Sequence, residues 1–579
     1  MWPFRMLPPS AGRVAGVLAR KSTPRLRLSI VSGDIDAYKE TGTLRIDRSG
    51  LLGYARNAPQ PPSEPRAVAS VPELTPLLHT LRGMLRSRGP ISLAEYMRLA
   101  LCHPTLGYYM KRDIFGARGD FVTSPEVSQM FGELIAVWMF MTWRDCLSAP
   151  PRVRLVELGP GRGTLLCDVL RVCRRSFPAL AAAIQAIDLV EVSPALRLLQ
   201  ARALRCTGVP PKTAAGGVRS VTATTITNAV SGPGGATTVV SDEAQLAGDD
   251  VGVADAVDFS CDQTVGPDGP LPGLRVTWHN RFEDIPSAAV ATAPADPPQG
   301  GPLAAPPPSP PLLVLAHELF DALPVHQFVA VESATTPNRR QWRERLVDVA
   351  ESGTSGGGGL QLVLASGATP ASAAYAALLD ERVADAAART GGTALPLGSI
   401  VELCPAAEIL AASIADRIGA VGGAALIIDY GHGASDASSA TGKPSLRGIR
   451  GHAFTPSPLD APGEVDLSID VDFEALRRAA LRQQRVSVYG PVTQSYFLQS
   501  LGLEARATAL LRAAAAAGAD ASTLARLVSD AERLANPAQM GSIYKAMALV
   551  SARGVAHADR HPTSNEAMVG SAPPPPGFA

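Results

Sequence analysis

The 579-residue chain is 46% hydrophobic, which is ample for a sizeable core, and its 53 Gly and 50 Pro exceed the ordinary share and indicate inserted segments. Its 53 basic and 53 acidic side chains balance, so no global field draws it onto nucleic acid or an anionic membrane. The most apolar run, residues 134–143, falls short of the ~18 uninterrupted apolar residues of a membrane helix. We therefore expect no nucleic-acid partner and no integral membrane segment.

The first 40 residues have an unusual charge distribution. Six basic residues precede the first acidic residue, Asp34, and they are mixed with Leu, Val, Ala and Ser. This bias favours a mitochondrial or plastid presequence over residues 1–40, and the alternative is a disordered basic tail. Residues 41–76 include a Pro-rich stretch and are predicted to form a disordered linker.

The cysteines give no sign of a zinc site or of a disulfide framework. They are odd in number, scattered, and never form the paired short spacings of zinc ligands; the seven are Cys102, Cys146, Cys167, Cys173, Cys206, Cys261 and Cys404. We interpret them as reduced thiols in a non-secretory compartment.

Two apolar segments predict helices ahead of any sheet. Over residues 77–101, apolar side chains recur at helical spacing, and Ser92 with Glu95 has the pattern of a capping box. Residues 127–143 form a second apolar helical segment. We therefore expect an N-terminal helical region over 77–150.

Strands and helices then alternate. A short β run at 153–158 precedes a tight turn at 159–163 and a helix at 164–175, and a second strand and helix follow at 187–192 and 194–204. This alternation implies parallel pairing and an α/β sheet.

The later segments extend the same domain, which we expect to span 151–550. Further strands are predicted at 276–282, 312–316 and 424–430, an antiparallel excursion at 326–332, 342–350 and 360–365, and helices at 405–418 and 495–534. Two stretches rich in small residues and Pro, about 207–271 and 287–311, are predicted to be low-complexity insertions, and 551–579 a disordered tail.

The strongest functional signal is the turn after the first predicted strand. Gly159, Gly161 and Gly163 let the backbone turn sharply and let a ligand lie against the main chain. Glu191 ends the second predicted strand, where its carboxylate would point into the same crevice and accept hydrogen bonds from both hydroxyls of a ribose. This combination predicts an adenosyl ligand.

Other nucleotide ligands suit this turn less well. A dinucleotide fold requires Gly-x-Gly-x-x-Gly, whereas these glycines alternate, and Glu157 before the turn would repel a pyrophosphate. A phosphate loop requires a following Gly-Lys-Ser/Thr, and Thr164 comes next instead. A carboxylate at Glu157 suits the methionine ammonium of S-adenosylmethionine. The alternative is a glycine-rich turn that binds no ligand.

Several longer motifs resemble the MidA-like family of mitochondrial protein arginine methyltransferases. They lie at 119–133 (GDFVTSPEVSQMFGE), 156–163 (VELGPGRG), 317–326 (HELFDALPVH), 428–432 (IDYGH) and 536–541 (NPAQMG). The likeness runs from about 77 to 550 apart from the two insertions. It implies a class I, Rossmann-like methyltransferase fold, S-adenosyl-L-methionine as methyl donor, and symmetric dimethylation of an arginine in a core subunit of respiratory complex I. It also implies a place in the mitochondrial matrix and leaves a homodimer open.

Glu318 and Asp321 are the candidates for binding the arginine. A guanidinium stays charged because its pKa lies above ~12, so carboxylates must orient it. The two residues are spaced i to i+3 and would face the same side if a helix starts after the fourth strand. The alternative is that they only cap that helix and favour its positive end.

Thr123 and Ser124 carry hydroxyl groups that could close over the donor. The alternative is that Ser124 is only a helix N-cap, with Pro at the first helical position. Asp429 and His432 follow a strand of the same sheet and are expected on the substrate side. We expect no metal, because neither His317 nor His432 has a second ligand at chelating spacing.

Two other functions stay open at this point. One is a non-catalytic complex I assembly chaperone that retains an old cofactor pocket, and the other is a small-molecule methyltransferase. Intact glycines, Glu157 and Glu191 favour a working donor site, but the acceptor decides between a protein and a small-molecule substrate.

Overall fold

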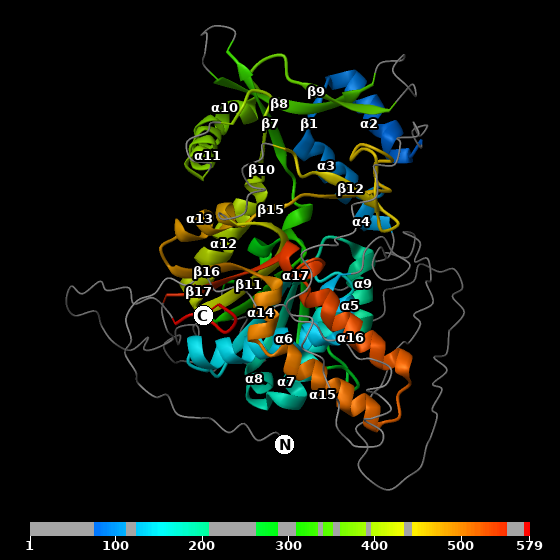
Figure 1. Ribbon diagram of the computed structural model, residues 1–579, viewed down its shortest axis with the longest axis vertical. Coiled ribbons are helices and arrows are strands. Elements are labelled where there is room, and N and C mark those ends of the chain that lie inside the picture. The colour runs from blue at the N-terminus through cyan, green and yellow to red at the C-terminus, as the bar shows by residue number, and fades with distance from the viewer. Residues whose placement is uncertain are drawn as a thin grey trace, which may run out of the picture.

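The computed structural model describes residues 74–111, 123–207, 262–287, 309–333, 340–350, 359–389, 395–433, 443–552 and 573–578. The predicted presequence, most of the predicted linker and most of both predicted insertions lie outside these residues. Figure 1 shows the described chain as a large sheet wrapped by helices, with a smaller sheet and its own helices above it.

The large sheet is mixed, with a parallel centre. Its strand order is β16 (Val486–Thr493), β17 (Tyr544–Ser551), β11 (Gly423–His432), β6 (Leu312–His317), β2 (Val153–Leu158), β3 (Ile184–Val190), β5 (Arg275–His279) and β4 (Asp262–Thr264), and β15 (Val471–Asp472) also pairs with β11. The strands from β11 to β5 run parallel, while β17 and β4 run antiparallel to their neighbours. The predicted Rossmann-like α/β sheet is confirmed.

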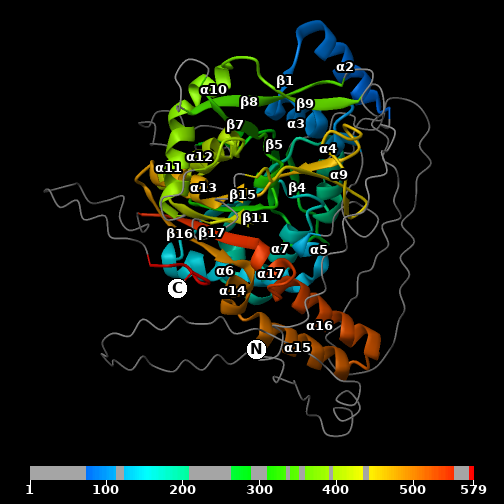
Figure 2. The ribbon, with the colours of Figure 1, turned by 45° about the horizontal axis from the view of Figure 1, so that its top comes forward.

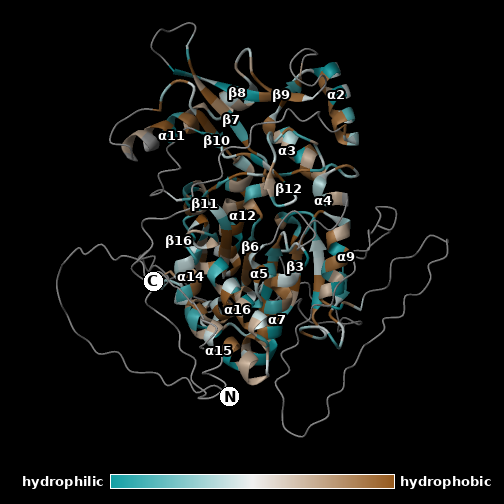
Figure 3. Cartoon of the chain, turned by 45° about the vertical axis from the view of Figure 1, so that its right-hand side comes forward, coloured by the Kyte–Doolittle hydropathy of each residue, from teal (hydrophilic) through white to brown (hydrophobic). Residues whose placement is uncertain are grey.

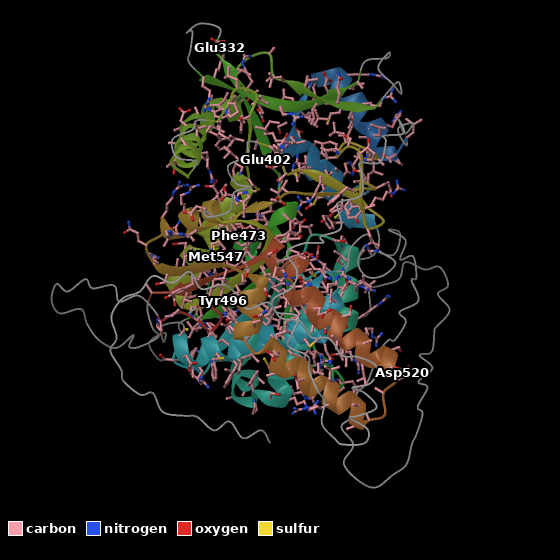
Figure 4. The ribbon with its side chains drawn as sticks, viewed as in Figure 1. Glu332, Glu402, Phe473, Tyr496, Asp520 and Met547 are labelled. Carbon is pink, nitrogen blue, oxygen red and sulfur yellow. The ribbon has the colours of Figure 1, made fainter. Side chains whose placement is uncertain are left out.

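Helices cover both faces of this sheet. One face packs against α6 (Gln129–Met141), α7 (Thr164–Ser176), α8 (Pro178–Ala183), α14 (Gln494–Ser500), α15 (Leu503–Ala516) and α16 (Ala521–Ala535). The other packs against α12 (Pro405–Val421) and α13 (Phe473–Leu481), and Figure 4 labels Phe473 and Met547 in this layer. Because central parallel strands are buried on both sides, they are mostly apolar, as Figure 3 shows for β6, although β2 contains Arg154 and Glu157 and β3 contains Asp188. Polar side chains can therefore gather at the carboxyl ends of these strands.

The smaller sheet stands over that carboxyl edge (Figure 2). It contains β1 (Ile91–Ser92), β8 (Arg340–Val349), β7 (His326–Glu332), β10 (Ile400–Leu403) and β9 (Leu360–Leu364), all paired antiparallel. Its helices are α2 (Pro76–Arg88), α3 (Leu93–Cys102), α10 (Pro370–Ala374) and α11 (Ala376–Arg389). The predicted antiparallel excursion is confirmed, and so is the predicted cap, since Ser92 Oγ accepts a 3.1 Å hydrogen bond from the Glu95 amide.

Short elements connect these layers. They are α4 (Tyr108–Lys111), α5 (Ser124–Val127), the π-turn η2 (Thr142–Cys146), α9 (Pro194–Ala203), the 3₁₀ turns η4 (Phe282–Asp284) and η5 (Phe320–Ala322), α17 (Met540–Ile543) and a small sheet of β12 (Arg447–Arg450), β13 (Ala453–Phe454) and β14 (Asp466–Ser468). Within the described ranges, no helix is both long and apolar enough to cross a membrane, and no group of three or more His, Cys, Asp or Glu could hold a metal ion.

Two expectations from composition are wrong in part. Residues 262–271, placed in the first insertion, contain β4, which extends the sheet by pairing with β5. Residues 573–578, placed in the disordered tail, pack against the body of the protein. The Phe578 ring lies 5.5 Å from that of Phe497, and Cys146 Sγ lies 3.8 Å from the Pro573 carbonyl. In both cases residues outside the segment order it: the following strand β5 for β4, and the distant Phe497 for Phe578.

Candidate active site

The glycine turn after β2 has the conformation that its sequence predicts. Gly159, Gly161 and Gly163 all have positive φ, at 63°, 55° and 83°, which side-chain-bearing residues adopt at a cost. A Cβ added to Gly159 would also lie 2.9 Å from Leu319 Cδ1. The turn is therefore fixed by its glycines, and its backbone is open to close approach by a ligand.

Glu191 lies directly after β3, where its carboxylate is buried but held by hydrogen bonds. One oxygen accepts from the Ser193 amide at 2.8 Å and the other from Gln200 Nε2 at 3.1 Å. Burial raises the pKa of Glu191 to about 7, and these two bonds act against that rise. Each carboxylate oxygen can accept two hydrogen bonds, so the arrangement leaves acceptor capacity for ribose hydroxyls.

Glu157 precedes the turn on β2 and is buried on the same face of the sheet as Leu155. Its Oε2 has no hydrogen-bond partner among the described residues, and burial alone raises the pKa of this carboxyl to about 8. A buried carboxyl without a partner is costly. When a cation approaches, the Glu157 carboxyl ionises and the cation becomes its partner.

Ser124 Oγ and His317 Nε2 are also among the buried atoms that lack a hydrogen-bond partner within the described ranges, and His317 Nε2 lies 3.4 Å from Glu318 Oε1. His317 is the last residue of β6 and lies on the same face as Glu157, one residue beyond the Leu158–Ala316 pairing. Burial lowers the pKa of His317 to about 3, so its imidazole is neutral and can donate or accept. These atoms, with Glu157 and Glu191, fit the methionyl and ribosyl ends of S-adenosylmethionine in chemical type.

Thr123 and Ser124 lie at the start of α5, and this helix begins one residue earlier than the sequence predicted. Thr123, rather than Ser124, is the N-cap and forms a capping box with Glu126, so the predicted cap is shifted by one residue. The Ser124 amide donates to Glu318 Oε1 at 3.5 Å, and Arg162 of the glycine turn lies 3.7 Å from Glu126. Helix α5 therefore contacts both the glycine turn and the residues after β6.

The expected helix after β6 does not form. Glu318 has φ of 50°, a left-handed conformation rare for a residue with a side chain, and only the 3₁₀ turn η5 follows it. Its amide donates to the Ile428 carbonyl at 2.9 Å, so pairing with β11 continues where a helix would have started. Neither the i to i+3 helical spacing nor simple α-helix capping describes Glu318 and Asp321.

Glu318, Asp321 and Asp429 nevertheless come together, and we call these three residues the acid cluster. Asp429 Oδ2 accepts from the amides of Phe320 and Asp321 at 2.9 and 3.3 Å. Burial, then the charge of Asp321, raises the pKa of Glu318 to about 8. Burial followed by Asp321 and Glu318 raises the pKa of Asp429 well above its usual value. Three carboxyls in one buried site raise one another's pKa. At Asp321 the Tyr430 hydrogen bond and the charge of Arg447, whose guanidinium lies 4.9 Å from the Tyr430 ring centroid, act against this rise.

Two tyrosines border the acid cluster. The Tyr430 hydroxyl donates to Asp321 and is also paired with Ser468, whose Oγ lies 3.3 Å from Asp321 Oδ2. Tyr544, opposite Tyr430 in the sheet, hydrogen-bonds to Glu318. The Tyr430 and Tyr544 rings meet edge to face with centroids 5.5 Å apart. The acid cluster thus has aromatic surfaces of the kind that pack against a guanidinium.

The structure brings the predicted site residues on the sheet together at the carboxyl ends of neighbouring strands, and Thr123 and Ser124 approach them from α5. The donor half, at β2 and β3, contains Glu157, Gly159, Gly161, Gly163 and Glu191, and the acceptor half, at β6 and β11, contains the acid cluster. His432 does not line the acid cluster. It borders a separate cavity of about 210 Å³ near Glu402, which Figure 4 labels between the two sheets.

Sequence reasoning missed three contributors. Tyr544 comes from the last strand and had no local signal. Ser468 lies in β14, within a second excursion after residue 430 for which the sequence predicted no individual strands. Gln200 could have been found, because it follows Leu196 by four residues on a helix and is a polar residue on the buried stripe.

Comparison with known proteins gives a consistent result. Residues 134–492 match the sequence model of a family described as "Putative S-adenosyl-L-methionine-dependent methyltransferase". The chain is 34% identical to "Protein arginine methyltransferase NDUFAF7, mitochondrial" of Mus musculus, over 83% of this chain and 85% of the mouse protein. It is 33% identical to the Drosophila melanogaster homolog, over 87% and 92%.

A solved structure shares the fold. It is described as a "likely methyl transferase from Burkholderia thailandensis bound to S-adenosyl-homocysteine", with a TM-score of 0.53 and 21% identity, over 84% of this chain and 97% of that chain. At this identity the likeness bears on the fold alone.

Proposed function

This chain belongs to the family of S-adenosyl-L-methionine-dependent methyltransferases that its motifs predicted, and on that premise we propose that it methylates an arginine side chain of a protein. The donor is S-adenosyl-L-methionine. The observation that carries the arginine assignment is the acid cluster, which places three buried carboxyls beside the donor half, where burial and mutual repulsion raise the pKa of Glu318 and Asp429 and a bound cation would lower both. The names of the mouse and fly relatives, which specify arginine, support it.

We assign the residues of the donor half as follows. Glu191 would accept hydrogen bonds from the ribose hydroxyls, and Glu157 would accept them from the methionyl ammonium. The glycine turn would contact the donor through its backbone, and Thr123 and Ser124 would contact the donor from α5. When bound, S-adenosylmethionine supplies an electrophilic methyl group on a cationic sulfur.

In the acceptor half, Glu318 and Asp321 orient the guanidinium and Asp429 holds η5 in place through its two amide hydrogen bonds. Fixing one nitrogen in line with the donor accounts for much of the rate that such a site can produce. That nitrogen must lose a proton as it is methylated. Glu318, with a pKa raised to about 8, is suited to accept it near neutral pH.

The finer assignments rest on the family resemblance. The acceptor is an arginine in a core subunit of respiratory complex I, the product is symmetric dimethylarginine, the enzyme is of type II, and the compartment is the mitochondrial matrix. The relatives' designation as mitochondrial supports the compartment. Methylation supports assembly of the complex.

The test is to incubate the full chain with isotopically labelled donor and the complex I core subunits, and to map methyl groups by fragmentation mass spectrometry. We expect symmetric dimethylarginine that disappears with Glu191→Ala. Methyl transfer to a small molecule instead would refute the protein acceptor. Tight donor binding and tight subunit binding without transfer would refute catalysis and leave an assembly chaperone.

A further inference from the structure

Gln200 connects two parts of the donor half that are distant in sequence. It lies on α9, is fully buried, and donates from Nε2 to the Gly161 carbonyl at 2.8 Å and to Glu191 Oε2 at 3.1 Å. One carboxamide therefore bridges the backbone of the glycine turn and the carboxylate assigned to the ribose.

The orientation of this carboxamide is set by a third residue. Trp278, buried on β5, donates from its indole Nε1 to Gln200 Oε1 at 2.8 Å. A rotated amide would place its oxygen against two acceptors and its N–H groups against the indole donor. Since an indole nitrogen only donates and a carboxylate only accepts, the hydrogen-bonding types determine the orientation.

The packing around Gln200 ties it to the same two elements. Its Cα lies 3.5 Å from where a Cβ on Gly163 would be, so α9 is in contact with the end of the glycine turn. The other oxygen of Glu191 is held by the amide of Ser193, which is the N-cap of α9. The Ser193 amide therefore connects Glu191 to the start of α9, and Gln200 connects Glu191 to the glycine turn.

We propose that Gln200 is a positioning residue for the methyl donor: its carboxamide fixes the Glu191 carboxylate relative to the Gly161 backbone, and Trp278 fixes the carboxamide. The inference rests on the proposed assignment of Glu191 to the ribose. Its consequence is that the ribose end of the donor site is pre-formed before ligand arrives, because neither Glu191 nor Gln200 has to be reoriented on binding.

The burial of the three residues makes the effect measurable. Replacing Gln200 by Leu leaves Glu191 Oε2 and the Gly161 carbonyl without their donor, and groups that lose a hydrogen bond in this way shift away from their binding geometry. It also removes a hydrogen bond that lowers the pKa of Glu191. Donor binding should then require higher pH.

The test measures S-adenosylhomocysteine affinity of the full chain by titration calorimetry. We expect Gln200→Leu to weaken binding roughly 10- to 100-fold and Trp278→Phe roughly 3- to 10-fold, as lost hydrogen bonds to buried groups do. The double variant should be no weaker than Gln200→Leu, because Trp278 acts through Gln200. The matched control is Gln494→Leu, since Gln494 is equally buried and bonds to the Leu534 carbonyl on α16, and its affinity should be unchanged.

Two readouts separate positioning from general stability. An S-adenosylhomocysteine analogue lacking both ribose hydroxyls should bind the wild type and Gln200→Leu equally. The pH at which wild-type affinity falls, near 7, should move upward in the variant.

If Gln200→Leu does not fold, Trp278→Phe carries the same test. Equal losses for the natural ligand and the analogue would overturn the proposal, as would wild-type affinity in Gln200→Leu alongside lost affinity in Glu191→Ala. Unchanged affinity in Glu191→Ala would instead overturn the ribose assignment.

Discussion

The two halves of the site surround their buried carboxyl groups in different ways. In the donor half, Glu191 is surrounded by N–H donors that are already in place. In the acceptor half, Glu318, Asp321 and Asp429 also accept hydrogen bonds, including those of three backbone amides to Asp429 and of the Tyr430 hydroxyl to Asp321, but these carboxyls lie close enough to raise one another's pKa. The ribose end of the donor half is pre-formed around Glu191, whereas Glu157 and the acid cluster are arranged to be completed by a cation.

This difference predicts how each half responds to change. Variants in the donor half should alter donor affinity and leave the protonation of the acceptor half unchanged. Variants in the acceptor half should alter acceptor affinity and transfer rate, and loss of the Glu318 carboxyl should remove the dependence of acceptor binding on pH. The predictions below are ordered from the largest expected effect to the smallest.

Glu318→Gln should lower the rate of methyl transfer roughly 100-fold or more, because it removes both a negative charge from the guanidinium site and the proton acceptor. Donor affinity should stay within about threefold of wild type. Single-turnover kinetics and donor titration measure the two separately. Glu402→Gln, which alters a partly buried carboxyl bonded to Ser445, is the control and should retain activity. A variant with normal transfer would remove Glu318 from the mechanism.

Gly159→Ala should weaken donor binding roughly 10- to 30-fold, because it forces a side chain into a left-handed conformation costing about 1–2 kcal/mol and against Leu319. Gly273→Ala is the matched control, since Gly273 has φ of 82° but nothing within 4 Å of an added Cβ. Both variants should lose stability, and only Gly159→Ala should lose donor affinity. Equal donor affinities would show that the turn does not contact the donor.

Acceptor affinity should rise about tenfold per pH unit between pH 6 and 8 and level off above that. The free Glu318 carboxyl has a pKa raised to about 8, so it is protonated at neutral pH, and a bound guanidinium favours the ionised form. Binding therefore releases a proton, and raising the pH promotes it. Calorimetry of an arginine peptide in buffers of different ionisation enthalpy measures this release. Glu318→Gln should flatten the profile, and proton uptake by the wild type would contradict the sign.

Ser468→Ala should lower kcat/KM for the acceptor about threefold to fivefold, because it removes one of the hydroxyls that hold Asp321. Ser551→Ala, a change at an equally buried serine beside the far end of β11, should leave kcat/KM unchanged. Steady-state assays at saturating donor compare the two. A larger loss of kcat/KM in Ser551→Ala would show that the effect comes from lower stability of the sheet.

The sequence predicted the donor half better than the acceptor half, for a physical reason. The glycine turn and Glu191 depend on local backbone geometry and on the ends of consecutive strands, both of which a sequence encodes directly. Glu318 depends on a hydrogen bond to β11, more than a hundred residues later. That bond holds a left-handed conformation in place of the expected helix.

The same reasoning accounts for the other differences. Strand β4 forms because β5 offers an edge for pairing, although its own residues have a low-complexity composition. Phe578 is ordered because Phe497 offers a ring to pack on. Composition describes what a segment can do alone, whereas these segments are ordered by partners outside them.

The assignment of donor and acceptor to separate halves of the site is tested most directly by measuring the affinity of both ligands for both variants. Titrations of S-adenosylhomocysteine and of a complex I arginine peptide would be compared for wild type, Glu191→Ala and Glu318→Gln. We predict that Glu191→Ala loses the donor but binds the peptide normally, and that Glu318→Gln does the reverse. Loss of donor affinity in Glu318→Gln, or of peptide affinity in Glu191→Ala in the absence of donor, would contradict the assignment of the two halves.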